Sequence, residues 1–414
     1  MKNVGFVSTR LAGTDGVSLE TYKWYQVLER NGFNCFAFAG ELGTPKDKSF
    51  LEPKAHFADP EILDIHEECF GKLKRKASLS RRMHELRDLL KSRLYEFCTE
   101  FDIDLLIPEN ALAIPMHIPL GMAITEYIAE TGIPTIAHHH DFVWERSRFL
   151  INSVQDFLDY SFPPRLSSIH HVVINSAASR DLSYRRGISN DVIPNVFDFG
   201  TPSEPSPAAQ ELRKELGFED GELFVLQPTR IVPRKWVERG IELVNLLSLE
   251  RPRLIISHEL GDEGDQYALR IMEYSHRLGV EVICIGDMIG ASRGFVERSE
   301  KHYTIDDVYH AADLVVYPSG YEGFGNAFVE AIYFKKPIVL NRYSIFIEDI
   351  EPYGFDVIPF DGFVTLQTVK QIEEMLEPKK LSEATEKNYK LGQTHFSYEV
   401  LEDILLPIIE SCFR

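Results

Sequence analysis

Two glutamates and two glycines surround Phe324 in the stretch Tyr317 to Phe334, YPSGYEGFGNAFVEAIYF, where a predicted strand ends and a predicted helix begins. The free backbone N–H groups at the start of a helix bind anions such as phosphate, and glycine lets the backbone approach the anion closely. Carboxylates repel phosphate, so Glu322 and Glu330 are better suited to accept hydrogen bonds from the hydroxyls of a ribose or a hexose. A nucleotide sugar carries phosphate, ribose and hexose together. The alternative is that Glu322 is a turn residue and Glu330 a solvated helix position.

The same string resembles the donor-binding signature of family 4 glycosyltransferases, PSxxEGFGxxxxEA, in which two glutamates are separated by seven residues. The matching positions are Pro318, Ser319, Glu322, Gly323, Phe324, Gly325, Glu330 and Ala331. The resemblance implies that Glu322 contacts donor hydroxyls and Glu330 the ribose, while Phe324, Gly325 and Asn326 present backbone N–H groups. It also implies the GT-B fold, retention of anomeric configuration, and no obligatory divalent metal or other cofactor besides the nucleotide-diphosphate sugar as donor substrate.

A cluster of basic residues opens the second half of the chain, in LQPTRIVPRKWVERGIELV. Such crowding of positive charge in an acidic protein indicates that an anion binds nearby. The position of the segment supports this, because it follows a strand end, where ligands of doubly wound sheets bind. By resemblance to the family, Arg230 and Lys235 contact the donor diphosphate and neutralise the charge that grows on it as the glycosidic bond breaks. The alternative is a solvated basic turn.

The first half carries a candidate phosphate loop, TRLAGTDGVSLETYKW, between a predicted strand and helix. It lacks the full G-x-G-x-x-G fingerprint of dinucleotide-binding proteins. Family members commonly have a Gly-Gly loop here, whereas this chain has Asp15 followed by Gly16. We expect Gly16 to admit donor phosphate or acceptor to the backbone and Asp15 to contact acceptor. The alternative for both is a tight turn that requires these residue types.

Three histidines end another predicted strand, in IAHHHDFVWERSRF. Side chains alternate along a strand, so three consecutive histidines cannot point the same way, and a three-histidine zinc site is sterically disfavoured. His139 is expected to be buried and neutral. By resemblance to the family, His140 faces the donor sugar, with Asp141 beside it. We expect Arg146 and Arg148, at a predicted helix start, to contact an anionic acceptor; ion pairs with Glu145 or Asp156 are the alternative.

Composition restricts the partners. The chain has 64 acidic and 44 basic side chains, a net charge of -20, which opposes binding to nucleic acid or an anionic bilayer and favours a small-molecule partner. The basic stretch GKLKRKASLSRRMHELRDLLKSRL has apolar residues at helical spacing, typical of a helix packed on its domain, with membrane-surface binding as the alternative. Neither the Asp-x-Asp of FDIDLL nor the acidic loop GDEGDQY is expected to hold a metal. Five widely spaced cysteines and the absence of a long apolar run indicate a cytoplasmic protein.

Short apolar runs alternate with amphipathic segments along most of the 414 residues, a pattern typical of βαβ units with parallel strands. A Pro- and Ser-rich linker, FDFGTPSEPSPAAQ, divides the pattern into two halves. We therefore expect an α/β protein with two Rossmann-like, doubly wound domains facing a cleft. Residues 1–197 form the acceptor domain, residues 198–394 the donor domain, and residues 395–414 a helix that crosses back to the first domain.

The sequence thus predicts a retaining glycosyltransferase that moves a hexose from a nucleotide-diphosphate sugar to a hydroxyl of a small polar acceptor. The arginines favour an acceptor with phosphate or carboxylate, of the compatible-solute type. Two alternatives stay open: a glycosyltransferase acting on a lipid or cell-surface glycan, and a non-catalytic nucleotide-sugar-binding protein. A sugar phosphorylase or a nucleotide-sugar epimerase shares the two-domain architecture, but no pyridoxal-binding lysine is identified.

Overall fold

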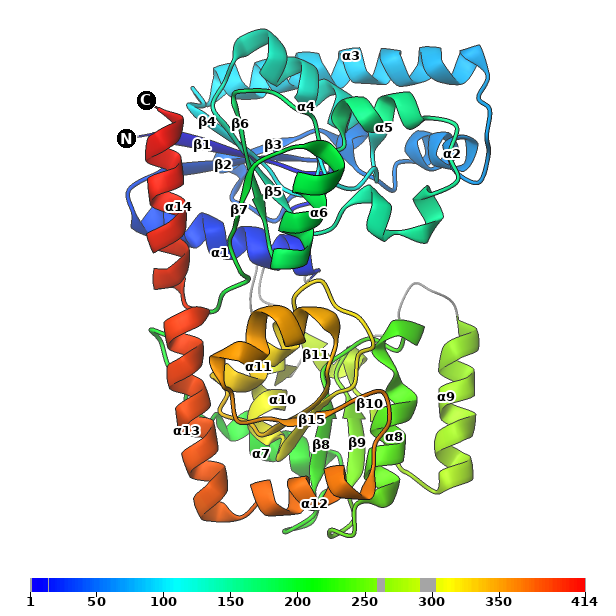
Figure 1. Ribbon diagram of the computed structural model, residues 1–414, viewed down its shortest axis with the longest axis vertical. Coiled ribbons are helices and arrows are strands. Elements are labelled where there is room, and N and C mark those ends of the chain that lie inside the picture. Colours follow the sequence, from blue (N-terminus) through cyan, green and yellow to red (C-terminus); the bar gives the residue numbers. More distant parts are fainter. Residues whose placement is uncertain (1, 14, 259–264, 291–302, 414) are drawn as a thin grey trace. The chain divides into compact units, whose positions relative to one another are not determined.

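The computed structural model describes residues 2–13, 15–258, 265–290 and 303–413. The chain divides into two compact units. Unit 1 contains the residues up to Pro194 and those from Leu401 onward, and unit 2 contains most of the residues from Asn195 to Val400. Each unit is built on its own parallel β-sheet (Figure 1), which confirms the predicted α/β class.

The sheet of unit 1 has, among the described residues, seven parallel strands in the order β3-β2-β1-β4-β5-β6-β7. Their bounds are β1 Asn3–Val7, β2 Asn34–Ala39, β3 Ser49–Leu51, β4 Leu105–Pro108, β5 Thr135–His139, β6 Ile169–Val173 and β7 Asn190–Val192. The central strands are buried along nearly their whole length because both faces of the sheet are covered by helices.

Helices pack on both faces of this sheet: Figure 1 shows α3 and α4 on one side and α1 and α6 on the other. The helices of unit 1 are α1 Gly16–Arg30, α2 Pro60–Cys69, α3 Ala77–Glu100, α4 Ile118–Thr131, α5 Gln155–Ser161 and α6 Ser176–Arg186. The basic stretch forms α3, whose residues Leu79, Met83, Leu86, Leu90 and Leu94 are buried as its spacing predicts. Leu90 and Leu94 share a core with α4 and the sheet, so α3 is a packed helix.

The sheet of unit 2 has, among the described residues, six parallel strands in the order β10-β9-β8-β13-β14-β15. Their bounds are β8 Phe224–Gln227, β9 Arg253–Ile256, β10 Val282–Cys284, β13 Leu314–Tyr317, β14 Ile338–Asn341 and β15 Ile358–Phe360. A separate short pair joins β11 Ile289–Gly290 to β12 Tyr303–Thr304.

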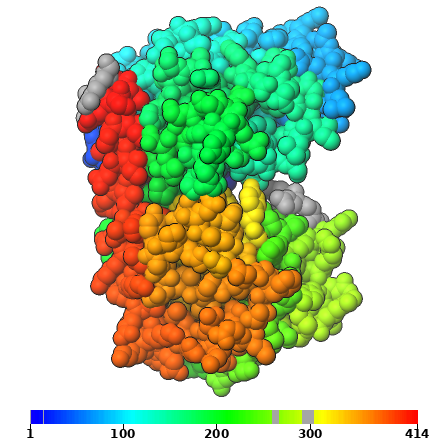
Figure 2. Space-filling model, in the orientation of Figure 1, coloured from blue at the N-terminus to red at the C-terminus, as the bar shows by residue number. Residues whose placement is uncertain are grey.

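The helices of unit 2 are α7 Pro207–Glu215, α8 Val237–Leu246, α9 Asp265–Leu278, α10 Ile305–Ala311, α11 Asn326–Tyr333, α12 Leu366–Met375 and α13 Pro378–His395. Side chains of α8, α9 and α12 share one apolar core with the sheet. Figure 2 shows α12 and α13, in orange to red, forming part of the visible surface of this unit.

The predicted crossing of the C-terminal helix is confirmed. α14 spans Tyr398–Cys412, and its part from Leu401 onward belongs to unit 1. Leu405 and Ile409 of this helix are buried, and the Lys2 ammonium lies 4.1 Å from the centre of the Phe413 ring. The last helix therefore packs in the same unit as the first strand.

Candidate functional site

The junction between β13 and α11 has the geometry of an anion-binding helix start. Gly325 precedes α11 with φ of +119°, a left-handed conformation that disfavours any residue with a side chain. The Tyr343 hydroxyl donates to the Phe324 carbonyl at 2.8 Å, and a Cβ on Gly325 would collide with that hydroxyl. Within the described part of the chain no side chain caps α11, so its first N–H groups are available to a ligand.

A basic turn after β8 contacts this junction through Glu322. The carboxylate is buried and forms ion pairs with Lys235 and with Arg234, the latter at 3.1 Å. The two loops are also joined by their backbones, because the Gly320 N–H donates to the Arg234 carbonyl at 3.0 Å. A Cβ on Gly320 would collide with the indole of Trp236, so this close approach requires glycine. Glu322 is therefore more than a turn residue.

The charges of this cluster are set by its neighbours. Burial raises the pKa of Glu322, but Lys235 and Arg234 outweigh it, so the pKa lies below its usual value and the carboxylate stays ionised. Arg230 and His258 belong to the same neighbourhood. Loss of hydration and repulsion by Lys235 and Arg230 lower the pKa of His258 to about 4. The cluster thus presents three cations and a neutral imidazole to any anion.

Glu330 lies one turn inside α11 and is half-buried. Its carboxylate accepts a hydrogen bond of 2.8 Å from the hydroxyl of Tyr309, a buried residue of α10. This contact contradicts the alternative of a solvated helix position. Asn326, the first residue of α11, accepts a hydrogen bond of 2.7 Å from the Asn195 side chain.

In unit 1, the corresponding loop before α1 is already closed by a side chain. The Asp15 carboxylate accepts hydrogen bonds from the backbone N–H groups of Val17 and Ser18 at 3.1 and 3.2 Å, and it pairs with Arg10 at 3.0 Å. Asp15 is the N-cap of α1, and Gly16 is the first helical residue. The turn interpretation of these residues is supported, and the cap disfavours an anion at Gly16.

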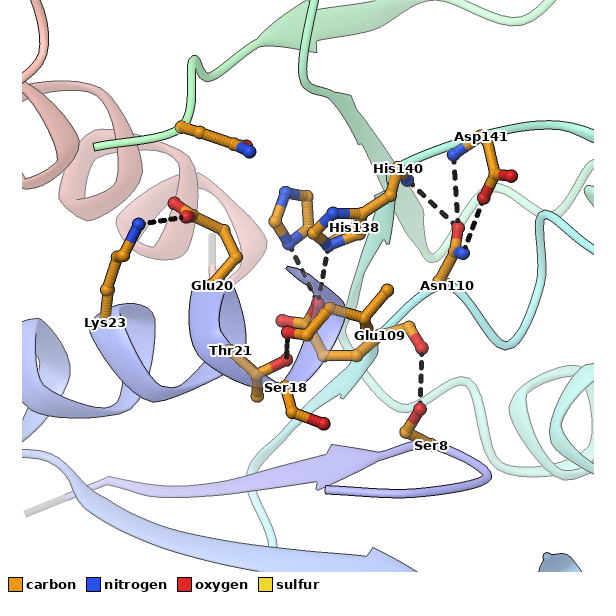
Figure 3. Close-up of polar contacts among 12 residues, drawn as sticks. Ser8, Ser18, Glu20, Thr21, Lys23, Glu109, Asn110, His138, His140 and Asp141 are labelled. Atoms are coloured by element: carbon orange, nitrogen blue, oxygen red, sulfur yellow. Dashed lines mark hydrogen bonds and ion pairs between the residues drawn. The ribbon is translucent and has the colours of Figure 1, made fainter. Parts of the chain in front are cut away.

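A buried carboxylate joins two of the three histidines. Glu109, directly after β4, lies 2.9 Å from Nδ1 of His138 and 3.5 Å from Nε2 of His140 (Figure 3). His139 points to the other side and lies 2.9 Å from Nδ1 of His171, so it is buried as expected. Within the described residues, Glu109, His138 and His140 are the group whose ligand atoms are close enough to surround one metal ion.

A second polar network follows β5. The Asn110 amide donates to Asp141 at 2.8 Å and accepts from the backbone N–H of His140 at 3.0 Å. Asp141 also accepts a hydrogen bond of 2.6 Å from Arg146. The network fixes the backbone that carries His140, and Asn110 and Glu109 are the members that the sequence pattern did not indicate.

The predicted environment of the two arginines was partly wrong. Arg146 lies between two short 3₁₀ turns, Val143–Glu145 and Ser147–Phe149, and Arg148 lies in the second, so neither residue starts an α-helix. The partner of Arg146 is Asp141, and Asp156 is paired with Arg75 at 2.5 Å. Tight turns form here because Glu145 accepts the Phe142 N–H, which closes the chain on itself.

Two acidic segments were considered for metal binding. Asp104, in FDIDLL, accepts the Asn3 backbone N–H at 2.9 Å and pairs with Lys2, so it serves the start of the sheet. The loop GDEGDQY lies mainly outside the described residues. None of the helices in the described ranges is both long enough and apolar enough to cross a membrane.

Comparison with known proteins gives a consistent result. A family model described as "Glycosyl transferases group 1" matches residues 208–391, which lie almost entirely in unit 2. The chain is 32% identical to the mannosylglucosylglycerate synthase of Thermotoga maritima over 94% of this chain and 96% of that one. It is 31% identical to the synthase of the same name from Petrotoga mobilis, over 86% of each chain.

Solved structures share the fold. Sucrose-phosphate synthase from Thermosynechococcus elongatus superposes with a TM-score of 0.69 at 14% identity, covering 100% of this chain and 99% of that one. Anabaena HepE in complex with UDP and glucose gives a TM-score of 0.66 at 16% identity, covering 99% and 100%. Since a full-length relative shares almost a third of its residues and the donor signature is intact, the chain belongs to the group 1 glycosyltransferases and is a glycosyltransferase of the GT-B fold.

Proposed function

We propose that this enzyme transfers a mannosyl group from a nucleoside diphosphate mannose to a hydroxyl of glucosylglycerate, with retention of configuration. The observation that supports the proposal is the cationic β13–α11 junction, in a chain that matches mannosylglucosylglycerate synthases over nearly its whole length. The name of those relatives describes a product with a mannosyl, a glucosyl and a glycerate part, which suggests an anionic sugar acid as acceptor.

Unit 2 is proposed to hold the donor. Arg230 and Lys235 bind the diphosphate, and the N–H groups of Phe324, Gly325 and Asn326 point toward its oxygens at the uncapped start of α11. Glu330 accepts hydrogen bonds from the ribose hydroxyls, and Glu322 accepts them from hydroxyls of the sugar.

Donor binding has to rearrange the charges seen here. Lys235 and Arg234 are paired with Glu322, so they exchange a carboxylate for the diphosphate when the donor binds. The exchange frees Glu322 to accept hydrogen bonds from the sugar. Because the ion pair already neutralises the two cations, it reduces the cost of keeping them buried before the donor arrives.

The reaction itself breaks the bond between C1 of the sugar and the diphosphate oxygen and forms a bond from C1 to the acceptor oxygen. The acceptor hydroxyl gives its proton to the departing phosphate oxygen on the same face, so no nucleophile of the enzyme is needed. Lys235 and Arg230 stabilise the negative charge that grows on the leaving diphosphate. The proposed scheme requires no metal ion.

Unit 1 is proposed to serve the acceptor, with His140 contacting the transferred sugar. Asp141 follows His140 directly, Arg146 and Arg148 come shortly after it, and the side chain of Arg146 is 38% exposed. A guanidinium matches the geometry of a carboxylate, so these arginines are suited to the glycerate part of the acceptor. Asp15 is the N-cap of α1, so its carboxylate serves the start of that helix.

The free cysteines of the described chain, three of them buried, suit a reducing compartment, and we propose that the enzyme acts in the cytoplasm.

The test is a matrix of nucleoside diphosphate sugars against glucosylglycerate, glycerate and glucose, with product analysis by NMR. We expect one mannosyl donor and glucosylglycerate to give product with an α-configured new bond from an α-configured donor. Turnover only with uncharged acceptors would refute the anionic acceptor. Binding of donors without hydrolysis or transfer to any acceptor would favour a nucleotide-sugar sensor instead.

A further inference from the structure

Glu109 holds two imidazoles with one carboxylate. Its Oε2 lies 2.9 Å from Nδ1 of His138 and 3.5 Å from Nε2 of His140, and its side chain is fully buried. His138 is equally inaccessible, with 1% of its side chain exposed, whereas His140 keeps 9%. Of the three groups, His140 is therefore the one that can reach a ligand, and Glu109 lies behind it.

The backbone that carries the Glu109 carboxylate is fixed from several directions. The backbone N–H of Glu109 donates to the Val7 carbonyl at 2.8 Å, its backbone carbonyl accepts from the Ser8 hydroxyl at 3.0 Å, and the residue is bridged to His138 on the neighbouring strand. The Trp24 ring, on α1, stacks on His138 at a centroid distance of 4.1 Å. Figure 3 shows the Glu109 carboxylate beside the imidazoles of His138 and His140, with Thr21 of α1 close by. A carboxylate on a fixed backbone, within 2.9 Å of an imidazole nitrogen, can orient that imidazole.

The charge of Glu109 has no cation beside it among the described groups of the cluster. Lys23, on α1, pairs with the buried Glu20 at 2.7 Å. The remaining polar or titratable groups that face the cluster are Thr21 of α1, His139 of β5 and Asp141 after it. The charge must then be neutralised by a proton, on the carboxyl or on an imidazole, or by a bound cation.

The surroundings of the two imidazoles favour a shared proton over a metal ion as the group that neutralises Glu109. A histidine that ligates a metal nearly always donates its other ring N–H to an acceptor. If His138 bound a metal through Nδ1, its Nε2 would be buried without a hydrogen-bond partner among the described residues. A proton shared between Glu109 and the imidazoles needs no such acceptor, and the short separation from His138 is that of a hydrogen bond.

We propose that Glu109 is a positioning residue that fixes the ring orientation and tautomer of His140, both directly and through His138, for contact with the transferred sugar. The inference rests on the proposed function of His140 in transfer. Burial raises the pKa of Glu109, and burial lowers the pKa of His138 to about 4, so both groups resist carrying full charge and one proton is shared within the cluster.

The first experiment compares Glu109→Gln and Glu109→Asp with wild type. We expect Glu109→Gln to lower kcat by about 10- to 100-fold, as large as the loss of an outer partner that orients a metal-ligating histidine, with the Kd for nucleoside diphosphate unchanged. Glu109→Asp should restore part of kcat. Glu52→Gln is the matched control, because Glu52 is also a buried carboxylate of unit 1 but pairs with Arg93 away from the histidines.

The pH dependence of kcat separates positioning from simple structural support. The Glu109 carboxylate raises the pKa of His140, although burial and His138 lower it overall. Removing the carboxylate therefore lowers the pKa of His140 further, so the limb of the kcat profile governed by this residue should move to lower pH. An unchanged profile together with an unchanged kcat in Glu109→Gln would overturn the proposal.

Two further measurements use the wild-type protein, so they do not depend on a variant that folds. Ring ¹⁵N NMR should show one fixed tautomer for His138, protonated on Nδ1; freely exchanging tautomers would overturn the proposal. One equivalent of tightly bound transition metal in the purified wild-type enzyme would also overturn it in favour of a metal site. If wild type fails to transfer any sugar, the proposed function fails, whereas normal transfer by Glu109→Gln refutes only this inference.

Discussion

The two units differ in how the first N–H groups of a helix that follows a strand are bonded. In unit 1 the first N–H groups of α1 are bonded to the carboxylate of Asp15, which brings its own negative charge to the positive helix end. In unit 2 α11 begins at a left-handed glycine, and no side chain in the described ranges caps it. Its nearby carboxylate, Glu322, is instead paired with Lys235 and Arg234.

The difference shows which junction is suited to a phosphate. A helix start that is capped by a carboxylate binds an additional anion weakly. Its N–H groups already have an acceptor, and the negative charge of the carboxylate repels the anion. The open end of α11 has donors in place, and cations lie beside it. Two glycine-containing loops at equivalent positions, before α1 and before α11, therefore differ in their ability to bind an anion.

The largest effect is expected from the cations beside the open junction. Lys235→Ala and Arg230→Ala should each lower kcat/KM by on the order of 10²-fold, because the leaving diphosphate loses charge stabilisation. Steady-state kinetics measures kcat/KM, and circular dichroism checks that the fold persists. Arg239→Ala is the control, since Arg239 is a nearby cation of α8 paired with Glu242. Equal activity of all three variants would remove the diphosphate assignment.

The two glutamates of the junction should fail differently. Glu330→Ala should weaken nucleoside diphosphate binding by roughly 1.5 to 3 kcal/mol, because a hydrogen bond from the ribose to a charged group is lost. Glu322→Ala should leave that binding at least as tight as in wild type, because Lys235 and Arg234 are released for the diphosphate. It should instead depress transfer and blur discrimination between epimeric donors.

Calorimetric titration of nucleoside diphosphate into both variants, with rates for two epimeric donors, makes this comparison. Equal loss of affinity in both variants, or no loss in either, would show that the junction does not hold the donor in the proposed orientation.

The smallest effect is expected at the closed junction. Asp15→Ala should lower the free energy of unfolding by about 1 kcal/mol, the usual cost of losing an N-cap, and should leave nucleoside diphosphate affinity unchanged. Denaturant titration measures the first and calorimetry the second. Thr365→Ala, which removes the cap of α12, is a matched control in unit 2. A loss of nucleotide affinity in Asp15→Ala alone would mean that this loop also takes part in donor binding.

Central strands and the donor loop could be predicted from the sequence because their signals are local. β1, β4, β8 and β13 are continuous apolar runs, and the glutamates of the junction belong to one short string. The short strands β3, β7 and β15 have no clear sequence signal, since three residues carry almost no periodicity.

The contacts that complete the site depend on residues far apart in the chain. Arg234 meets Glu322 only because β8 and β13 are neighbours in the sheet, and Glu109 meets His138 only through the register of adjacent strands. The one local sign of Glu109 is an acid directly after the apolar run of β4. Burying an acid costs free energy unless it has a hydrogen-bond or charge partner. The sequence therefore indicates that a partner exists but does not identify it.

The interrupted sequence of unit 1 has a consequence for how the protein is made. The chain leaves this unit at Pro194 and rejoins it at Leu401, and the intervening segment builds unit 2. On the ribosome, unit 2 is a nearly continuous stretch that can fold as it emerges, whereas unit 1 waits for α14 to cover its last apolar surface. Until Leu405 and Ile409 are synthesised, the surface they cover is exposed to chaperones and to other nascent chains.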